Sequence, residues 1–191
     1  MGDFLEIRWH GRGGQGAKTV ALLFADAVMS EGKYIQAFPE YGPERMGAPV
    51  QSFDRISDKP ITIHCGITNP SVVVVLDPTL TSKVDVTAGL NKGGKLIINT
   101  DKSSDQIKKE LNIKDIDVYT LDASKISRET IGRDIPNTPM LGALVKITGI
   151  MEIGKMMGDI EKKLKLKFAS KPEVIKGNLD AIKRAYEEVR S

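Results

Sequence analysis

The residues best suited to chemistry form a glycine-rich turn, Gly11-Arg12-Gly13-Gly14-Gln15-Gly16. The turn has the G-x-G-x-x-G spacing and lies between a strand-like and a helix-like segment, the context that gives this spacing meaning. Glycines let the backbone approach a ligand, and the unpaired N–H groups of a helix start favour an anion such as a phosphate. Arg12 and Gln15 would be the polar groups that face outward. The same turn can instead pack a helix tightly against a strand with no ligand, and both interpretations stay open.

A dinucleotide cofactor would require a second feature, which this sequence lacks. Such a site places an acidic residue near the end of the second strand, where it binds the ribose hydroxyls. Residues 36–39 read Gln-Ala-Phe-Pro at that place, and Glu40 lies beyond the proline. A free-standing dinucleotide-binding dehydrogenase is therefore disfavoured, although it remains an alternative.

The segment Pro39–Pro49 is a second candidate, with three prolines and two glycines. This composition interrupts both regular structures and predicts a shaped surface loop. Within it, Tyr41, Glu44 and Arg45 combine an aromatic ring with charge on rigid turns, which suits a partner interface or closure over a neighbouring site. The alternative is a solvated loop whose charged side chains face water.

Histidine and cysteine are too few for metal chemistry. His10 and His64 are the only histidines, and they stand alone in strand-like segments, which predicts structural roles. Cys65 is the only cysteine, so the chain can form no internal disulfide and no four-thiolate iron–sulfur site. We expect Cys65 to be a buried packing thiol, and we expect no metal site in this chain.

The elements that must position these residues alternate between strands and helices. Leu5 to His10 alternates as a strand does, and the apolar stripe from Val20 to Val28 is typical of a helix that ends at Gly32. Tyr34 to Phe38 then predicts a second strand, which completes a βαβ unit with a right-handed crossover. Three more strands and a helix are predicted further on: Val72–Leu76, Lys95–Asn99, Val118–Leu121 and a helix around Asp105–Leu111.

An antiparallel hairpin is expected where Val50–Ile56 and Ile61–His64 flank a four-residue turn composition. Helical stripes dominate the last third, and Thr138 is expected to cap a helix whose first position is Pro139. Together the patterns predict one domain over residues 1–191. Its fold class is three-layer α/β/α, with a Rossmann-like, mostly parallel sheet, an antiparallel hairpin and a helical C-terminal third.

Composition limits the classes of function. The chain of 191 residues is 40% hydrophobic and 28% charged, a globular balance, and its formal net charge is only +3. This charge is too small to indicate binding to nucleic acid or to a membrane surface. The first residues show no basic and apolar leader pattern, and no apolar run approaches spanning length. We therefore expect a cytoplasmic protein.

Four blocks of residues go beyond generic α/β patterning. They are Ile7 to Ala17, Gln36 to Arg45, Gly47 to Pro49, and Ile135 to Leu144. In this order, and across nearly the whole chain, they resemble the gamma subunits of pyruvate:ferredoxin oxidoreductases, also called pyruvate synthases, in the 2-oxoacid:ferredoxin oxidoreductase family. The residues Trp9-His10 and Phe38-Pro39-Glu40 resemble those of the pyruvate and branched-chain members rather than those of the 2-oxoglutarate members.

The resemblance implies a role inside an assembly. The family converts a 2-oxoacid and coenzyme A to acyl-CoA and carbon dioxide and passes electrons to ferredoxin, using thiamine diphosphate, Mg²⁺ and iron–sulfur clusters. These cofactors are expected on alpha, beta and ferredoxin-like delta subunits, and none on this chain, which would not be catalytic alone. The glycine turn would hold a coenzyme A phosphate, with Asn137 and Thr138 as further candidates. Pyruvate and 2-oxoisovalerate both remain open as substrates.

Overall fold

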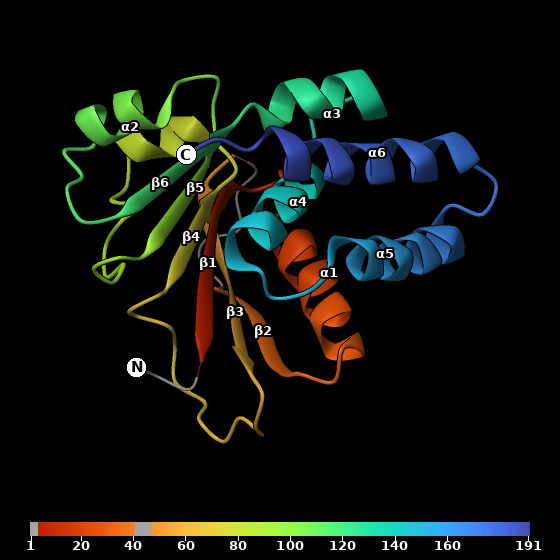
Figure 1. The fold of residues 1–191 in the computed structure, drawn as a ribbon, viewed down its shortest axis with the longest axis horizontal. Coiled ribbons are helices and arrows are strands. Elements are labelled where there is room, and N and C mark those ends of the chain that lie inside the picture. Colours follow the sequence, from red (N-terminus) through yellow and green to blue (C-terminus); the bar gives the residue numbers. More distant parts are fainter. Residues whose placement is uncertain (1–3, 41–46) are drawn as a thin grey trace.

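The computed structural model describes residues 4–40 and 47–191, which form a six-stranded sheet between two unequal helical layers (Figure 1). The order of strands across the sheet is β2-β3-β1-β4-β5-β6. The strands are β1 (Leu5–Arg12), β2 (Tyr34–Glu40), β3 (Pro49–Ser57), β4 (Val72–Val75), β5 (Lys95–Asn99) and β6 (Asp117–Leu121). The expected fold class, a mixed and mostly parallel α/β sheet, is confirmed.

The parallel half of the sheet consists of β1, β4, β5 and β6. The valines of β4 are all buried, since helical segments cover both of its faces, and this explains the uninterrupted β-branched run. The carboxyl ends of these four strands meet at one edge of the sheet. Both the glycine turn after β1 and the residues that follow β4 lie at this edge.

The antiparallel half differs from the sequence prediction in its pairing. β3 pairs antiparallel with β2 on one side and with β1 on the other, so β2 and β3 form the hairpin. The expected hairpin between Val50–Ile56 and Ile61–His64 is wrong, because residues 61–64 form no strand. Both edges of β3 are already occupied by β1 and β2, so residues 61–64 cannot pair with it. They pass beside β2 instead, where Gln36 Nε2 donates to Ile63 O at 2.9 Å. Pro39 and Glu40 extend β2, and Pro49 begins β3, so the predicted loop is shorter than expected.

Insertion of β3 also changes the expected βαβ unit. Helix α1 (Ala17–Ser30) connects β1 to β2, and these strands run in the same direction because each is antiparallel to β3. They are not neighbours, however. The acidic residue of a dinucleotide site would have to stand on the strand next to β1, whereas Glu40 stands two strands away.

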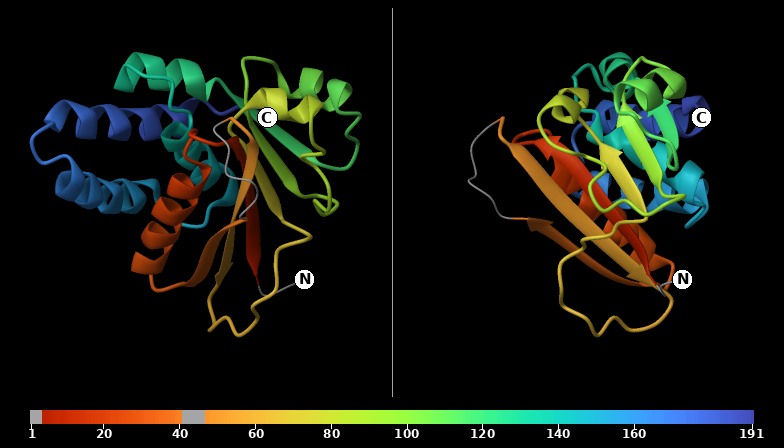
Figure 2. Two further views of the ribbon diagram at one scale, coloured as in Figure 1. Left: turned by 180° about the vertical axis from the view of Figure 1, so that it is seen from behind. Right: turned by 90° about the vertical axis from the view of Figure 1, so that its left-hand side faces the viewer.

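The helices are divided unequally between the two faces. One face carries α1, α3 (Ala123–Ile131), α4 (Asn137–Thr148), α5 (Ile153–Lys167) and α6 (Pro172–Glu188), and the other carries α2 (Ser104–Glu110) and the short 3-10 helix η1 (Pro78–Ser82) (Figures 1 and 2). The helical last third is confirmed. α3 was not predicted, although Asp122 marks its start by accepting a hydrogen bond from Lys125 N at 2.8 Å. No helix in the described ranges is long and apolar enough to cross a membrane.

The start of α4 lies earlier than expected. Pro136 is the N-cap residue and Asn137 the first helical residue, so the prediction that Thr138 caps the helix is wrong. The Thr138 side chain is instead inside the first turn and buried, and its backbone N–H donates to Asn137 Oδ1 at 2.7 Å. Both candidate side chains, Asn137 and Thr138, are therefore buried within the first turn of the helix.

Candidate functional site

The glycine turn joins the end of β1 to the start of α1 through close packing. A Cβ atom on Gly11 would lie 3.3 Å from both Ala17 Cβ and Leu76 Cδ1, which is tighter than ordinary contact. Gly14 differs, since a Cβ atom there would meet no atom of residues 4–40 or 47–191 within 4 Å. One side of the turn therefore packs the helix on the strand, and the other side is open.

The turn meets the start of α4, far away in the sequence. Gly16 has φ of 80°, and a Cβ atom on it would lie 2.4 Å from Asn137 Nδ2. That amide nitrogen donates to Gly16 O at 3.5 Å, and Asn137 is only 7% exposed. The structure thus brings Asn137 to the glycine turn, with Thr138 next to it in the first turn of α4. That either residue binds a ligand stays a prediction.

Two helix N-termini therefore converge at this edge of the sheet. The N-cap residues of α1 and α4 are Gly16 and Pro136, and neither makes a side-chain cap hydrogen bond within the described residues. One N–H in the first turn of α4, that of Thr138, is taken by Asn137 Oδ1. The first N–H groups of an α-helix lack partners within the helix and carry the positive end of its dipole. Their convergence at Gly16 produces an environment that favours an anion.

Arg12 is held by three separate segments. Its Nε donates to Asp77 Oδ2 at 2.9 Å, Nη2 donates to Thr79 Oγ1 at 2.8 Å, and Nη1 donates to Gly47 O at 3.0 Å. Gln15 joins the same network, because its Nε2 donates to Asp77 Oδ2 at 2.9 Å and its Oε1 accepts from Arg12 N at 2.7 Å. The two predicted polar residues are brought together, but they contact Asp77 rather than pointing freely outward.

Asp77 is the functional candidate that the sequence interpretation missed. It directly follows the buried run Val72–Leu76, and ligand-binding groups of parallel sheets gather at the carboxyl ends of such strands. Burial alone would raise the pKa of Asp77, but hydrogen bonds from Thr79, Gln15 and Arg12 lower it below the ordinary value. The carboxylate is therefore ionised and pairs with Arg12 at neutral pH.

The predicted partner interface lies mostly outside the described residues. Tyr41, Glu44 and Arg45 are among the residues that the structure does not describe, and their role stays a prediction. The following residues are tied to the glycine turn: Gly13 N donates to Ala48 O at 2.9 Å, and Gly47 N donates to Gly13 O at 3.1 Å. The segment after the predicted interface thus begins at the candidate site.

The structure agrees with the prediction for His10 but not with the prediction for Cys65. His10 is buried on β1, in agreement with a structural role, and burial together with repulsion from Arg8 lowers its pKa to about 4. His64 and Cys65 are exposed, so the expectation of a buried thiol is wrong. The Cys65 segment lies against the antiparallel half of the sheet, where Cys65 O accepts from Arg55 Nη1 of β3 at 3.0 Å.

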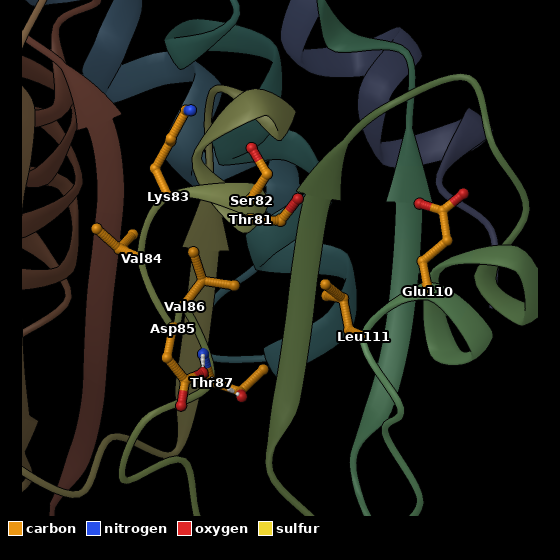
Figure 3. Close-up of a pocket in the computed structure, with 9 residues that line it drawn as sticks. All are labelled: Thr81, Ser82, Lys83, Val84, Asp85, Val86, Thr87, Glu110 and Leu111. Atoms are coloured by element: carbon orange, nitrogen blue, oxygen red, sulfur yellow. Dashed lines mark hydrogen bonds between the residues drawn. The ribbon is translucent and has the colours of Figure 1, made fainter.

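An open hollow of about 450 Å³ lies on the opposite helical face (Figure 3). Residues 81–87 line one side, and Glu110 and Leu111 line the other. Within it Asp85 Oδ1 accepts from Thr87 N at 2.9 Å and from Thr87 Oγ1 at 2.7 Å, which stabilises a tight turn. None of the residues that line the hollow belongs to the glycine turn. The described part of the chain contains no group of three or more His, Cys, Asp or Glu residues that could hold a metal ion.

Comparison with known proteins gives consistent matches along the chain. The family model described as pyruvate ferredoxin/flavodoxin oxidoreductase matches residues 6–188. A pyruvate synthase subunit PorC from Thermotoga maritima is 46% identical over 98% of this chain and 95% of the relative. A pyruvate/ketoisovalerate oxidoreductases common subunit gamma from Thermococcus litoralis is 48% identical over 96% of each chain.

A solved structure agrees with these matches in three dimensions. The crystal structure of the pyruvate oxidoreductase subunit PORC from Thermotoga maritima superposes with a TM-score of 0.86 at 43% identity, covering 99% of this chain and 98% of the other. The chain thus matches these relatives in sequence, and the solved one in fold, over almost the full length of each. This chain belongs to the pyruvate ferredoxin/flavodoxin oxidoreductase family.

Proposed function

We propose that residues 1–191 form the gamma subunit of a pyruvate:ferredoxin oxidoreductase. The complex would convert pyruvate, coenzyme A and oxidised ferredoxin to acetyl-CoA, carbon dioxide and reduced ferredoxin. The observation that carries this proposal is a sequence identity of 46% to a pyruvate synthase subunit over 98% of the chain. The chain would work in the cytoplasm with alpha, beta and delta subunits.

The chain's own residues do not suit the cofactors of the reaction. It has a single cysteine, whereas iron–sulfur clusters require several thiolates. The described residues offer no acidic or histidine cluster for the Mg²⁺ that accompanies thiamine diphosphate. We therefore assign thiamine diphosphate, Mg²⁺ and the clusters to the other subunits, and assign this chain to assembly and to the coenzyme A site.

The proposed contact with coenzyme A is a phosphate at the glycine turn. The converging starts of α1 and α4 favour an anion, and the open side of Gly14 gives it room. Arg12 is 27% exposed and can add a charge-assisted hydrogen bond. Such a bond is worth roughly 1.5 to 3 kcal/mol when shielded from water.

Kinetics of the assembled enzyme test this contact. Arg12→Ala should raise the Michaelis constant for coenzyme A by about tenfold or more, because each 1.4 kcal/mol corresponds to about a factor of ten. The constant for pyruvate should change little. An unchanged coenzyme A constant in a normally assembled complex would leave the glycine turn with its packing role alone.

Isolation of the native complex tests the subunit assignment. The chain should co-purify with alpha, beta and delta partners, and the complex should reduce viologen in the presence of pyruvate and coenzyme A. The chain alone should be colourless and inactive even with thiamine diphosphate, Mg²⁺ and coenzyme A added. Robust turnover by the isolated chain would refute the assignment.

A second substrate deserves the same assay. The Thermococcus litoralis relative is named as a subunit common to pyruvate and ketoisovalerate oxidoreductases. The alternative is therefore that this chain serves a 2-oxoisovalerate enzyme, alone or in addition. The oxoacid reacts at thiamine diphosphate, which we assign to other subunits, so the partners that co-purify should decide which oxoacid is oxidised.

A further inference from the structure

Asp77 uses both of its oxygens to join the glycine turn to the end of β4. Oδ2 accepts from Arg12 Nε and from Gln15 Nε2, each at 2.9 Å. Oδ1 accepts from Thr79 N at 2.9 Å and from Thr79 Oγ1 at 2.6 Å. The Asp77 side chain is only 13% exposed. Four donors on a largely buried carboxylate fix the positions of the groups that donate to it.

The contact with Asp77 restricts the position of the Arg12 side chain. Its guanidinium has five N–H groups, and the contacts to Asp77, Thr79 and Gly47 use three of them. The structure gives the other two no partner within residues 4–40 and 47–191. The base of the side chain is therefore fixed from three directions, while part of its charged head remains able to donate to a ligand.

We propose that Asp77 is a positioning residue for coenzyme A: it holds Arg12 and Gln15 so that the free N–H groups of Arg12 meet a phosphate at the open side of the glycine turn. This inference rests on the proposed function. Asp77 itself does not touch the ligand. Its effect on binding passes through Arg12.

Positioning and simple charge predict opposite results. A negative carboxylate near a phosphate repels it, so a purely electrostatic effect means that removal of the charge lowers the coenzyme A Michaelis constant. If Asp77 positions Arg12, removal of the charge frees the guanidinium and raises that constant. The direction of the change therefore separates the two explanations.

The test is steady-state kinetics of the reconstituted complex carrying Asp77→Asn. Asparagine has nearly the same shape and remains a good N-cap for Thr79 N, so η1 should persist while the ion pair to Arg12 is lost. We expect the coenzyme A constant to rise by about tenfold, as for Arg12→Ala, with the pyruvate constant and kcat within about twofold of the parent. A lowered or unchanged coenzyme A constant would overturn the proposal.

A matched control exists in the same chain. Asp85 accepts from Thr87 N and Oγ1 in the same way as Asp77 accepts from Thr79, but it lines the hollow of Figure 3, and the part of the chain that the structure describes gives it no hydrogen bond from residues 11–16. Asp85→Asn should therefore leave the coenzyme A constant unchanged. A rise equal to that of Asp77→Asn would mean that loss of any such turn is sufficient, and would overturn the proposal.

A double-mutant cycle tests whether the effect passes through Arg12. The complex carrying both Arg12→Ala and Asp77→Asn should show the same coenzyme A constant as Arg12→Ala alone, because a positioning residue has nothing left to position. Additive increases would refute the role of Asp77 as a positioning residue. If Asp77→Asn fails to assemble, Thr79→Val removes one hydroxyl of the network, with Thr87→Val as its control, and the same rise is expected.

Amide hydrogen exchange separates failure of this inference from failure of the coenzyme A site. In the complex without ligand, Asp77→Asn should speed exchange across residues 11–16, and Asp85→Asn should not. If Arg12→Ala leaves the coenzyme A constant unchanged, the proposed site is wrong and the inference falls with it, even when exchange increases. If Arg12→Ala raises the constant but Asp77→Asn alters neither binding nor exchange, only the inference is wrong.

Discussion

Acid should destabilise this protein through His10. The side chain is 2% exposed, and its Nε2 atom has no hydrogen-bond partner among the described residues. Burial is the main reason that its pKa falls from 6.5 to about 4; the charge of Arg8 acts in the same direction and Asp85 acts against both. Because the folded state binds the proton less well than the unfolded state, His10 contributes stability above pH 6.5 that is lost as the pH falls toward 4.

The size of the effect follows from the two pKa values. A pKa shift from 6.5 to about 4, at 1.36 kcal/mol per pKa unit, corresponds to about 3 kcal/mol of unfolding free energy. Between about pH 7.5 and pH 5, the lost part is about 2 kcal/mol, because the unfolded histidine is almost fully protonated at the lower pH while the folded one is not. Between these two pH values, the unfolding free energy of His10→Gln should fall by about 2 kcal/mol less than that of the parent chain, whatever the stability of the variant at neutral pH.

The assay is urea denaturation of the purified chain at both pH values. His64 provides the control, since it is the other histidine and is exposed. His64→Gln should keep the full pH dependence of the parent chain. Equal losses of unfolding free energy in the parent and in His10→Gln would refute the assignment of the acid sensitivity to this residue.

Two other predictions concern the interface and the core. Tyr41→Ala combined with Arg45→Ala should weaken binding to the alpha and beta partners by about tenfold in a pull-down titration, with an unchanged melting temperature; unchanged binding would make the segment a solvated connection. Asp54 is completely buried, and burial raises its pKa well above the ordinary value against the opposing hydrogen bond from Trp9. The stability that Asp54 contributes is therefore lost as the pH rises, and Asp54→Asn should raise the melting temperature at about pH 7.5, with a gain that shrinks toward pH 5. A gain that is constant with pH would contradict this reasoning.

Much of the fold was accessible from local patterns. The continuous β-branched run of β4 and the apolar stripes of α5 and α6 were predicted, because burial on one or two faces leaves a direct periodic record in the sequence. The hairpin was predicted with the wrong partner. Periodicity indicates that a segment is a strand, but it does not specify which other strand lies beside it.

The candidate site shows the same division. The spacing of Gly11 to Gly16 between a strand and a helix indicated a turn suited to an anion, and the four blocks indicated the family. Asp77 was missed because a single aspartate after a strand has no distinctive spacing. Its importance appears only when β1 and β4 lie side by side and bring Arg12 within 2.9 Å of it.

The sequence by itself determined most of the strands and helices, the lack of enough cysteines for a cluster, and the place of the glycine turn, since each depends on residue type and near neighbours. The tertiary structure alone decided that β3 separates β1 from β2, that Asn137 meets Gly16, and that Arg12 is held by Asp77. These contacts join residues far apart in the chain. They depend on the order of strands in the sheet, which is fixed by competition among all the available edges and faces rather than by any local pattern.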